Sequence, residues 1–191
     1  MKVFITGVSS GIGRELAKEL VCQGHSVWGM ARRSQYLEEL KKELGSGPFF
    51  YSVGDVSLAS DVESIAKELY RSNFLPDIVV LNAGVFLEDF AGQFDYEVYQ
   101  RSFSVNLFGA INFVNKFADE FVKRGRGQFI AVSSTSAFRP DSLSAGYSAS
   151  KAALAMTFRS FNLRYQKDGI IFKTVFLGPV ATAMSAHVKL G

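Results

Sequence analysis

Short apolar runs alternate with helical patterns of apolar and polar residues along the whole chain. Six runs are predicted to be strands, because they are short, apolar and rich in β-branched or aromatic side chains: Val3–Thr6, Ser26–Met30, Phe49–Val53, Ile78–Leu81, Gln128–Ser133 and Phe172–Phe176. Between them, apolar residues recur with a helical period, which predicts helices over Gly11–Gln23, Gln35–Leu44, Leu58–Arg71, Tyr96–Arg124 and Tyr147–Gln166. We expect the long helical stretch over 96–124 to be two helices that meet near Asn106.

This order of elements predicts a single α/β domain over residues 1–191. Strands that alternate with helices and are almost wholly apolar form a parallel sheet with helices on both faces. Right-handed crossovers then give a doubly wound, Rossmann-type sheet, for which we expect the strand order 3-2-1-4-5-6. In such a sheet, ligands bind beyond the carboxyl ends of the strands.

The composition fits a packed domain and argues against several other classes. With 191 residues, of which 48% are hydrophobic, the chain can bury a core without disulfides or metals. The net charge of +3 is spread along the chain, which disfavours nucleic acid as a partner. No run approaches the ~20 apolar residues of a membrane span, so we expect a soluble, cytoplasmic protein that does not bind membranes. His25 and His187 lack partners at ligand spacing, so no metal is expected.

The single cysteine, Cys22, lies at the end of an apolar helical stripe. It cannot form an internal disulfide, which fits a reducing compartment. We expect Cys22 to be a core residue rather than a reactive thiol.

A glycine-rich turn follows the first predicted strand and opens the first helix. Its glycines let the backbone approach a pyrophosphate, and the helix N-terminus offers free N–H groups and a positive dipole end. The alternative is a tight turn without a ligand, which three glycines at this junction disfavour. The candidate phosphate-binding residues are Gly7, Ser9, Ser10, Gly11, Ile12 and Gly13.

Tyr147 and Lys151 lie four residues apart near the start of a predicted helix, and therefore on one face of it. A phenol titrates near pH 10 and is a poor acid or base at neutral pH. A neighbouring ammonium group favours the phenolate and lowers the pKa of the phenol. We therefore predict that Tyr147 donates or accepts a proton and that Lys151 lowers its pKa.

Five motifs occur in an order that resembles the short-chain dehydrogenase/reductase family. They are T-G-x-x-x-G-I-G at Thr6–Gly13, N-A-G at Asn82–Gly84, Asn106, Ser134, and Y-x-x-x-K at 147–151. The later segment Gly178–Thr182 is similar to that family's P-G-x-x-x-T region with Gly and Pro exchanged. The resemblance implies an oxidoreductase that transfers a hydride between a nicotinamide cofactor and a carbonyl or alcohol.

The resemblance also implies roles for individual residues. Ser134 would bond the substrate oxygen, with Ser133 as the competing candidate, and Asn106 would support a water relay from Lys151. Lys151 would also hold the nicotinamide ribose. A structural role is the alternative for three residues. Asn106 would bond backbone, Asp55 would be the N-cap of the next helix, and Asn82 would link strand ends. The remaining expected cofactor contacts are Asp55, Val56, Asn82, Ala83, Gly84, Pro179, Val180 and Thr182.

The end of the second strand favours NADP(H) over NAD(H). An NAD site places a carboxylate there, and this chain has Ala31 followed by Arg32 and Arg33. Arg32 can form a charge-assisted pair with a 2′-phosphate, with Arg33 as a helper and Ser9 and Ser10 as further donors. The alternative is a solvated basic turn, which the following helix N-terminus disfavours.

Segments after the later strands, at 85–95, 135–146 and 182–191, should form the substrate mouth. Their apolar side chains favour an apolar or aromatic carbonyl compound, although they could equally be core that anchors loops: Phe86, Leu87, Phe90, Phe94, Phe138, Leu143 and Met184. A non-catalytic NADP(H)-binding regulatory or interaction protein is the alternative function.

The resemblance further implies a homodimer or homotetramer, and another helix and strand after the sixth strand. The sequence lacks these last elements, and we favour a truncated sequence over a natural end covered by a partner.

Overall fold

The computed structural model describes residues 1–88, 95–139 and 142–180. Its strands form one parallel six-stranded sheet in the order β3-β2-β1-β4-β5-β6, as predicted. The strand bounds lie within two residues of those expected from the sequence: β1 Lys2–Thr6, β2 Ser26–Ala31, β3 Phe49–Val53, β4 Ile78–Leu81, β5 Gly127–Ser134 and β6 Ile170–Leu177.

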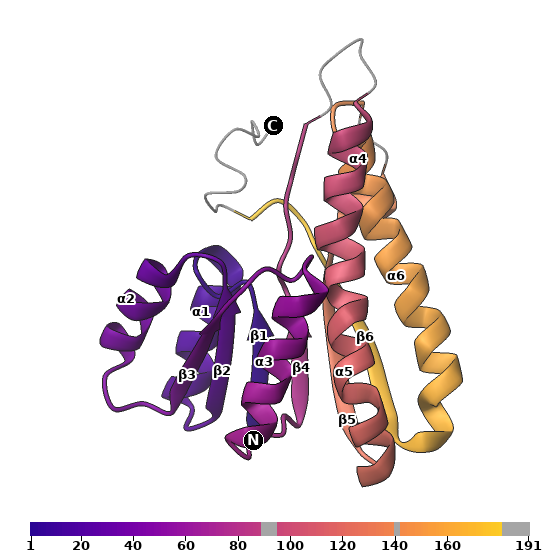
Figure 1. The fold of residues 1–191 in the computed structure, drawn as a ribbon. Coiled ribbons are helices and arrows are strands. Elements are labelled where there is room, and N and C mark those ends of the chain that lie inside the picture. The colour runs from indigo at the N-terminus through magenta and orange to yellow at the C-terminus, as the bar shows by residue number, and fades with distance from the viewer. Residues whose placement is uncertain (89–94, 140–141, 181–191) are drawn as a thin grey trace.

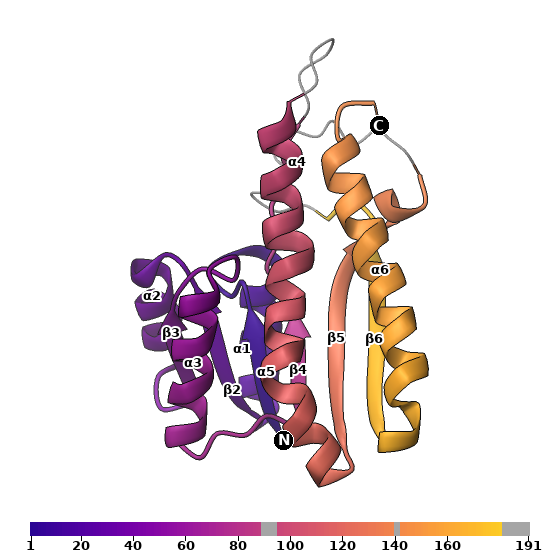
Figure 2. The same ribbon diagram turned by 45° about the vertical axis from the view of Figure 1, so that its right-hand side comes forward.

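The predicted helices are also present. They are α1 Gly11–Cys22, α2 Ser34–Leu44, α3 Ala59–Arg71, α4 Tyr96–Phe103, α5 Gly109–Arg124 and α6 Ala145–Tyr165. The expected break near Asn106 is a π-helical turn, η1 Ser104–Phe108, between α4 and α5. The three segments run on as one long rod, and α6 lies alongside it (Figure 2). Short 3₁₀ turns, η2 Thr135–Ala137 and η3 Gln166–Asp168, flank α6.

Alternation along β1 assigns its side chains to the two faces of the sheet. Val3 and Ile5 pack with Leu37 and Leu40 in the core formed with α1 and α2. Phe4 packs instead in the core formed with α3, α5 and α6. Figure 1 shows α3 and α5 in front of the sheet and α1 behind it. Each face of the sheet is therefore covered by its own group of helices, as a doubly wound fold requires.

Aromatic rings dominate the second of these cores. Phe4 lies 4.9 Å from Phe113 between ring centroids, and Phe129 lies 4.9 Å from both Phe121 and Phe172. These rings join the middle of the sheet to α5 and to the last strand.

Cys22 is exposed, which corrects the prediction that it is a core residue. The buried positions of α1 are Gly13, Ala17 and Val21, which repeat every four residues. Cys22 follows Val21 by one residue and is rotated by about 100° away from the buried stripe.

Candidate active site

A hollow of 640 Å³ lies at the carboxyl ends of the strands, where a doubly wound sheet binds its ligands. Every strand contributes, through itself or the segment that follows it, and α6 adds Tyr147 and Lys151. The predicted site residues that line this hollow are Gly7, Ser9, Ser10, Gly11, Ile12, Arg32, Arg33, Asp55, Val56, Asn82, Ala83, Gly84, Ser134, Tyr147, Lys151, Pro179 and Val180.

Hydrogen bonds join the ends of β1 and β4 below the hollow. The side-chain amide of Asn82 donates to the carbonyl oxygens of Thr6 at 3.0 Å and Gly7 at 3.1 Å. The hydroxyl of Thr6 accepts from the backbone N–H groups of Asn82 and Ala83, both at 3.0 Å. The predicted link between strand ends through Asn82 is therefore present, and Thr6 is a contributor that the sequence reasoning missed. A polar residue that closes a buried strand was the available signal.

The glycine-rich turn packs too closely for side chains. Gly7 has a φ of +77°, and a Cβ atom there would lie 2.8 Å from the Cα of Ala83. Gly13 is buried against Asn82 and Gly7 and does not line the hollow itself. Gly13 thus allows α1 to approach the strand ends.

The N-terminus of α1 is left without a compensating side chain. Ser10 is the N-cap residue but makes no side-chain capping bond, and the first turn contains no acidic residue. The N–H groups of this turn and the positive end of the helix dipole are consequently available to an anion.

The two arginines after β2 point to different partners. Arg32 forms an ion pair with Asp55 at 3.6 Å. Arg33 donates to the hydroxyls of Ser9 at 3.0 Å and Ser10 at 3.3 Å, and its guanidinium lies 4.3 Å from the ring centre of Tyr36. The structure therefore brings Arg33, rather than Arg32, onto the serines of the glycine-rich turn.

Asp55 organises the turn that follows β3. Its Oδ1 accepts from the backbone N–H of Ser57 at 2.9 Å and from the Ser57 hydroxyl at 2.7 Å. Burial raises the pKa of Asp55, but the hydrogen bonds from Ser57 and the charge of Arg32 outweigh it, so that the pKa lies below its usual value. Asp55 does not cap α3 directly, because the N-cap residue of that helix is Leu58.

Tyr147, Ser134 and Lys151 meet at the other end of the hollow. Nζ of Lys151 lies 5.8 Å from the ring centre of Tyr147 and donates to the carbonyl oxygen of Val132 at 2.8 Å. The Ser134 hydroxyl bonds with Ser136. Ser133 is buried and donates instead to the carbonyl oxygen of Lys151 at 3.1 Å, so its hydroxyl fastens β5 to α6.

Burial changes the acid–base properties of both residues of the pair. It raises the pKa of Tyr147 above its ordinary value, and hydrogen bonding with Ser134 opposes this only in part. Burial also lowers the pKa of Lys151 to about 8. The predicted lowering of the Tyr147 pKa by Lys151 is not seen in this structure. The physical reason is that Nζ is hydrogen-bonded to the carbonyl oxygen of Val132 and lies 5.8 Å from the ring centre, whereas burial of the phenol away from water has the largest effect on its pKa.

Asn106 lies beneath the hollow, in the π-helical turn, and is buried. Its Oδ1 accepts from the backbone N–H of Val85 at 2.8 Å, and its Nδ2 donates to the carbonyl oxygen of Val85 at 3.0 Å. Nδ2 also donates at 2.9 Å to Ser150, whose hydroxyl donates at 2.7 Å to the carbonyl oxygen of Tyr147. Asn106 thus bonds backbone, and Ser150 is a second contributor that sequence reasoning missed, although it stands inside the Y-x-x-x-K motif.

Gly84 connects this network to Lys151. A Cβ atom at Gly84 would lie 3.2 Å from Oδ1 of Asn106 and 3.4 Å from Nζ of Lys151. The small residues of the N-A-G motif therefore leave room for these two side chains as well as for a ligand.

The predicted substrate mouth is only partly described. Phe86 and Leu87 line the hollow, whereas Phe138 is exposed and packs on Phe176 with 4.5 Å between ring centroids. Several expected residues lie outside the described part of the chain: Phe90, Phe94, Thr182, Met184 and His187.

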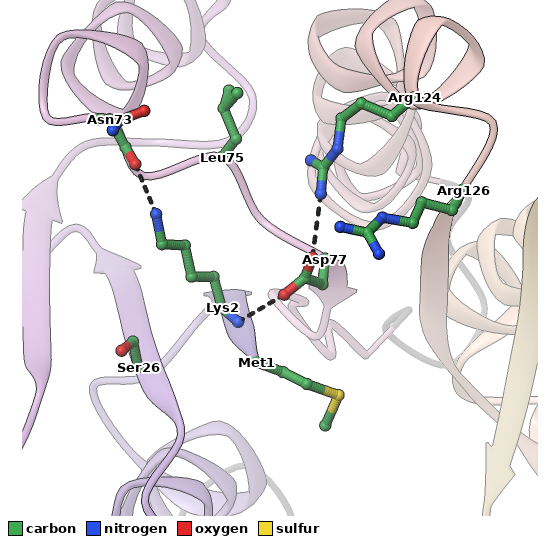
Figure 3. A pocket seen from close by; sticks show the side chains of 8 residues that line it. All are labelled: Met1, Lys2, Ser26, Asn73, Leu75, Asp77, Arg124 and Arg126. Atoms are coloured by element: carbon green, nitrogen blue, oxygen red, sulfur yellow. Dashed lines mark hydrogen bonds and ion pairs between the residues drawn. The ribbon is translucent and has the colours of Figure 1, made fainter.

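A second hollow, of 450 Å³, lies at the opposite ends of the strands (Figure 3). There Asp77 accepts from the backbone N–H of Lys2 and from Arg124, and Nζ of Lys2 donates to the carbonyl oxygen of Asn73. These bonds tie the starts of β1 and β4 to the end of α5, so the hollow marks a structural joint far from Tyr147.

Two further properties concern only the residues that the structure describes. None of their helices is long and apolar enough to cross a bilayer. Their His, Cys, Asp and Glu side chains form no group of three or more that could hold a metal ion.

Comparisons with known proteins agree with the fold. Residues 1–190 match the family model for short chain dehydrogenases. An 11-beta-hydroxysteroid dehydrogenase-like protein of Arabidopsis thaliana is 34% identical, with 96% of this chain and 60% of that protein covered. An uncharacterized oxidoreductase of Staphylococcus epidermidis is 29% identical, with 98% of this chain and 81% of that protein covered.

A solved structure of a serine dehydrogenase in complex with NADP⁺ superposes with a TM-score of 0.91. It is 26% identical and is matched over 97% of this chain and 75% of its own. The family match and these relatives place the chain among the oxidoreductases. The chain belongs to the short-chain dehydrogenase family.

Proposed function

We propose that this chain is an NADP(H)-dependent oxidoreductase that transfers a hydride between the nicotinamide and a carbonyl or alcohol substrate. The observation that carries the proposal is that Ser134, Tyr147 and Lys151 line the same hollow as the glycine-rich turn. A module that only binds a nucleotide has no need of an acid, a hydroxyl donor and a buried amine at one end of its site. Cofactor-binding and catalytic residues then share one domain over residues 1–191.

The residues around the glycine-rich turn fit the phosphates of such a cofactor. The α1 N-terminus has no side-chain cap and no acidic residue in its first turn, and Gly7 leaves the backbone open to close approach. Asp55 and Val56 would meet the adenine, and Ala83 and Gly84 would flank the bound dinucleotide. A structural neighbour of this chain, a serine dehydrogenase, was solved in complex with NADP⁺, which supports a dinucleotide as the ligand.

The preference for NADP(H) rests on the arginine pair. Arg33 already donates to Ser9 and Ser10, so one guanidinium and two hydroxyls converge where a 2′-phosphate can bind. Arg32, held by Asp55 at 3.6 Å, is the second cation at this end of the hollow. We therefore assign the leading role to Arg33 and a supporting role to Arg32.

At the reacting end, each side chain has one task. The cofactor supplies the hydride when it is bound. Ser134 donates a hydrogen bond to the substrate oxygen. Tyr147, whose pKa lies above its ordinary value, carries its proton at neutral pH and gives it to the oxygen as negative charge develops there. Lys151 donates one N–H to the carbonyl oxygen of Val132, which leaves two N–H groups to donate to the ribose hydroxyls of the cofactor.

The decisive experiment measures oxidation of NADPH and NADH by the purified chain with a panel of carbonyl compounds. We expect turnover with NADPH, and we expect Tyr147→Phe to lower kcat at least about a hundredfold, the usual range for loss of a general acid, while NADPH still binds. If Tyr147→Phe weakened NADPH binding as much as it lowered kcat, the assigned role of Tyr147 would be contradicted. Tight NADPH binding without turnover of any carbonyl would favour the non-catalytic alternative.

An apolar or aromatic substrate, a cytoplasmic location and a homodimer or homotetramer stay predictions from the sequence.

A further inference from the structure

Phe86 packs edge-on against the ring of Tyr147. The two ring centroids lie 5.0 Å apart, with 74° between the ring planes, and both residues line the hollow. Phe86 comes from the segment after β4, whereas Tyr147 comes from the first turn of α6. An edge-to-face pair has a preferred direction as well as an apolar contact, so each ring limits the rotation of the other.

The backbone on both sides of this contact is fixed by one buried network. Asn106 holds both the N–H and the carbonyl of Val85, the residue before Phe86. Through Ser150, the same side chain is joined to the carbonyl oxygen of Tyr147. Asn106 and Ser150 are both almost fully buried, so these bonds are shielded from water. The distance between the two rings is therefore set by the fold.

This contact leaves Tyr147 with an apolar side and a polar side. Phe86 lies against the ring of Tyr147, and Ser134 lies near enough to the phenol hydroxyl to oppose in part the rise of its pKa. Val85 and Leu87, on either side of Phe86 in the chain, and Leu177 are further apolar residues that line the hollow. A substrate whose carbonyl oxygen lies between Ser134 and Tyr147 can place one of its two substituents against these apolar side chains.

We propose that Phe86 positions Tyr147 for proton transfer and selects carbonyl compounds that carry a flat, apolar substituent, such as an aryl group. This proposal rests on the proposed function, because it assigns a substrate class to the same site. A flat substituent can stack against or meet the edge of Phe86, whereas a polyhydroxylated chain would leave its hydroxyls unpaired there.

The first experiment compares kcat/KM for an aryl methyl ketone and for a straight-chain methyl ketone with the same number of carbon atoms. We expect the wild-type chain to prefer the aryl ketone. Phe86→Ala should lower this preference at least about tenfold, as loss of an apolar contact typically does. Phe86→Tyr keeps the ring edge and should retain the preference. An unchanged preference in Phe86→Ala would overturn the specificity role.

The second experiment measures the pKa of Tyr147 by ultraviolet absorbance without turnover. The signal of Tyr147 is the difference between each protein and the same protein with Tyr147→Phe, which removes the contribution of the other tyrosines. Phe86 contributes to the burial that raises the pKa of Tyr147, so Phe86→Ala should lower this pKa and Phe86→Tyr should not. Lys151 faces the same ring in all variants and acts as a constant background. An unchanged pKa in Phe86→Ala would overturn the positioning role.

Phe50→Leu is the matched control, because Phe50 is a partly exposed phenylalanine on β3 that packs on Trp28 and Phe74. It should change neither the substrate preference nor the pKa of Tyr147. If the wild-type chain binds NADPH but reduces no carbonyl, the proposed function fails, and the pKa measurement still decides whether Phe86 positions Tyr147.

Discussion

At the scale of single residues, the site depends on side chains whose surroundings alter their chemistry. Lys151 is the clearest case, since it is a buried cation with one hydrogen bond, to Val132. Its pKa falls from 10.5 to about 8 on burial, which means that the fold opposes the charge of this amine. A residue that lowers stability and is nevertheless present at the reacting end of the hollow fits a functional role.

This burial predicts a pH-dependent gain in stability for Lys151→Met. Between about pH 8 and 10.5 the unfolded chain binds more protons at this residue than the folded chain, so the free energy of unfolding of the wild type rises with pH there. Below pH 8 the wild type carries the full cost of burying the charged amine, about 3 kcal/mol from the difference in pKa. Lys151→Met removes this cost but also loses the hydrogen bond to Val132, which is worth about 1 kcal/mol. We expect Lys151→Met to be about 2 kcal/mol more stable at pH 7.

Urea denaturation of both proteins at pH 7 and pH 10 measures this difference. The advantage of Lys151→Met should shrink or reverse at pH 10, where the wild-type amine is mostly neutral when folded. An advantage that stays constant with pH would show that burial of the charge is not its cause.

The arginines and Cys22 show what the sequence leaves open at the residue scale. Two adjacent cations after β2 predict a phosphate-binding end, but whether Arg32 or Arg33 reaches Ser9 depends on side-chain directions that only the folded backbone defines. Cys22 was predicted to lie in the core but is exposed. The buried stripe ends one residue earlier, and each residue along a helix rotates the side chain by about 100°.

At the scale of elements, the strands and helices could be predicted because their patterns are local. Buried strands such as Ile78–Leu81 are short apolar runs, and the amphipathic helices repeat with their own period. Even the break near Asn106 was visible, since Asn is a poor helix former. The partners of Asn106 could not be predicted, because Val85 and Ser150 lie 21 and 44 residues away in the sequence. Hydrogen bonds of this kind depend on how elements pack.

The π-helical turn predicts a large effect of Asn106→Ala on stability. The substitution leaves both backbone groups of Val85 and the hydroxyl of Ser150 without the partner that they have now. Since each unpaired buried polar group costs about 1–3 kcal/mol and some relaxation is expected, we expect the free energy of unfolding to fall by about 2–4 kcal/mol. Urea denaturation measures this loss.

Asn112→Ala is the control for this substitution on α5, because Asn112 makes a single, longer bond of 3.3 Å to the carbonyl oxygen of Val56. Its cost should be about 1 kcal/mol or less. Equal losses in the two variants would contradict the role of Asn106 as the joint between the β4 segment and α6.

At the scale of the whole molecule, the parallel sheet collects residues that are far apart in the sequence. Gly7 and Pro179 line one hollow because the strands before them are parallel and end at the same edge. The same topology explains why the location of the site could be predicted from motif order. A ligand in this hollow contacts segments from across the sheet, so its binding should stabilise the entire fold.

Thermal unfolding with and without cofactor tests this coupling together with the arginine assignment. At about 100 times its Kd, NADPH should stabilise the chain by about 2.7 kcal/mol and raise Tm by about 5 to 10 °C, whereas NADH at the same concentration should raise Tm less.

Arg33→Ala should remove most of the difference between the two cofactors, because it deletes the cation that Ser9 and Ser10 orient. Arg32→Ala should remove a smaller part, since Asp55 draws Arg32 aside. Equal shifts for NADPH and NADH in the wild-type chain would exclude the NADP(H) preference. A larger loss in Arg32→Ala than in Arg33→Ala would reverse the assignment of the two side chains.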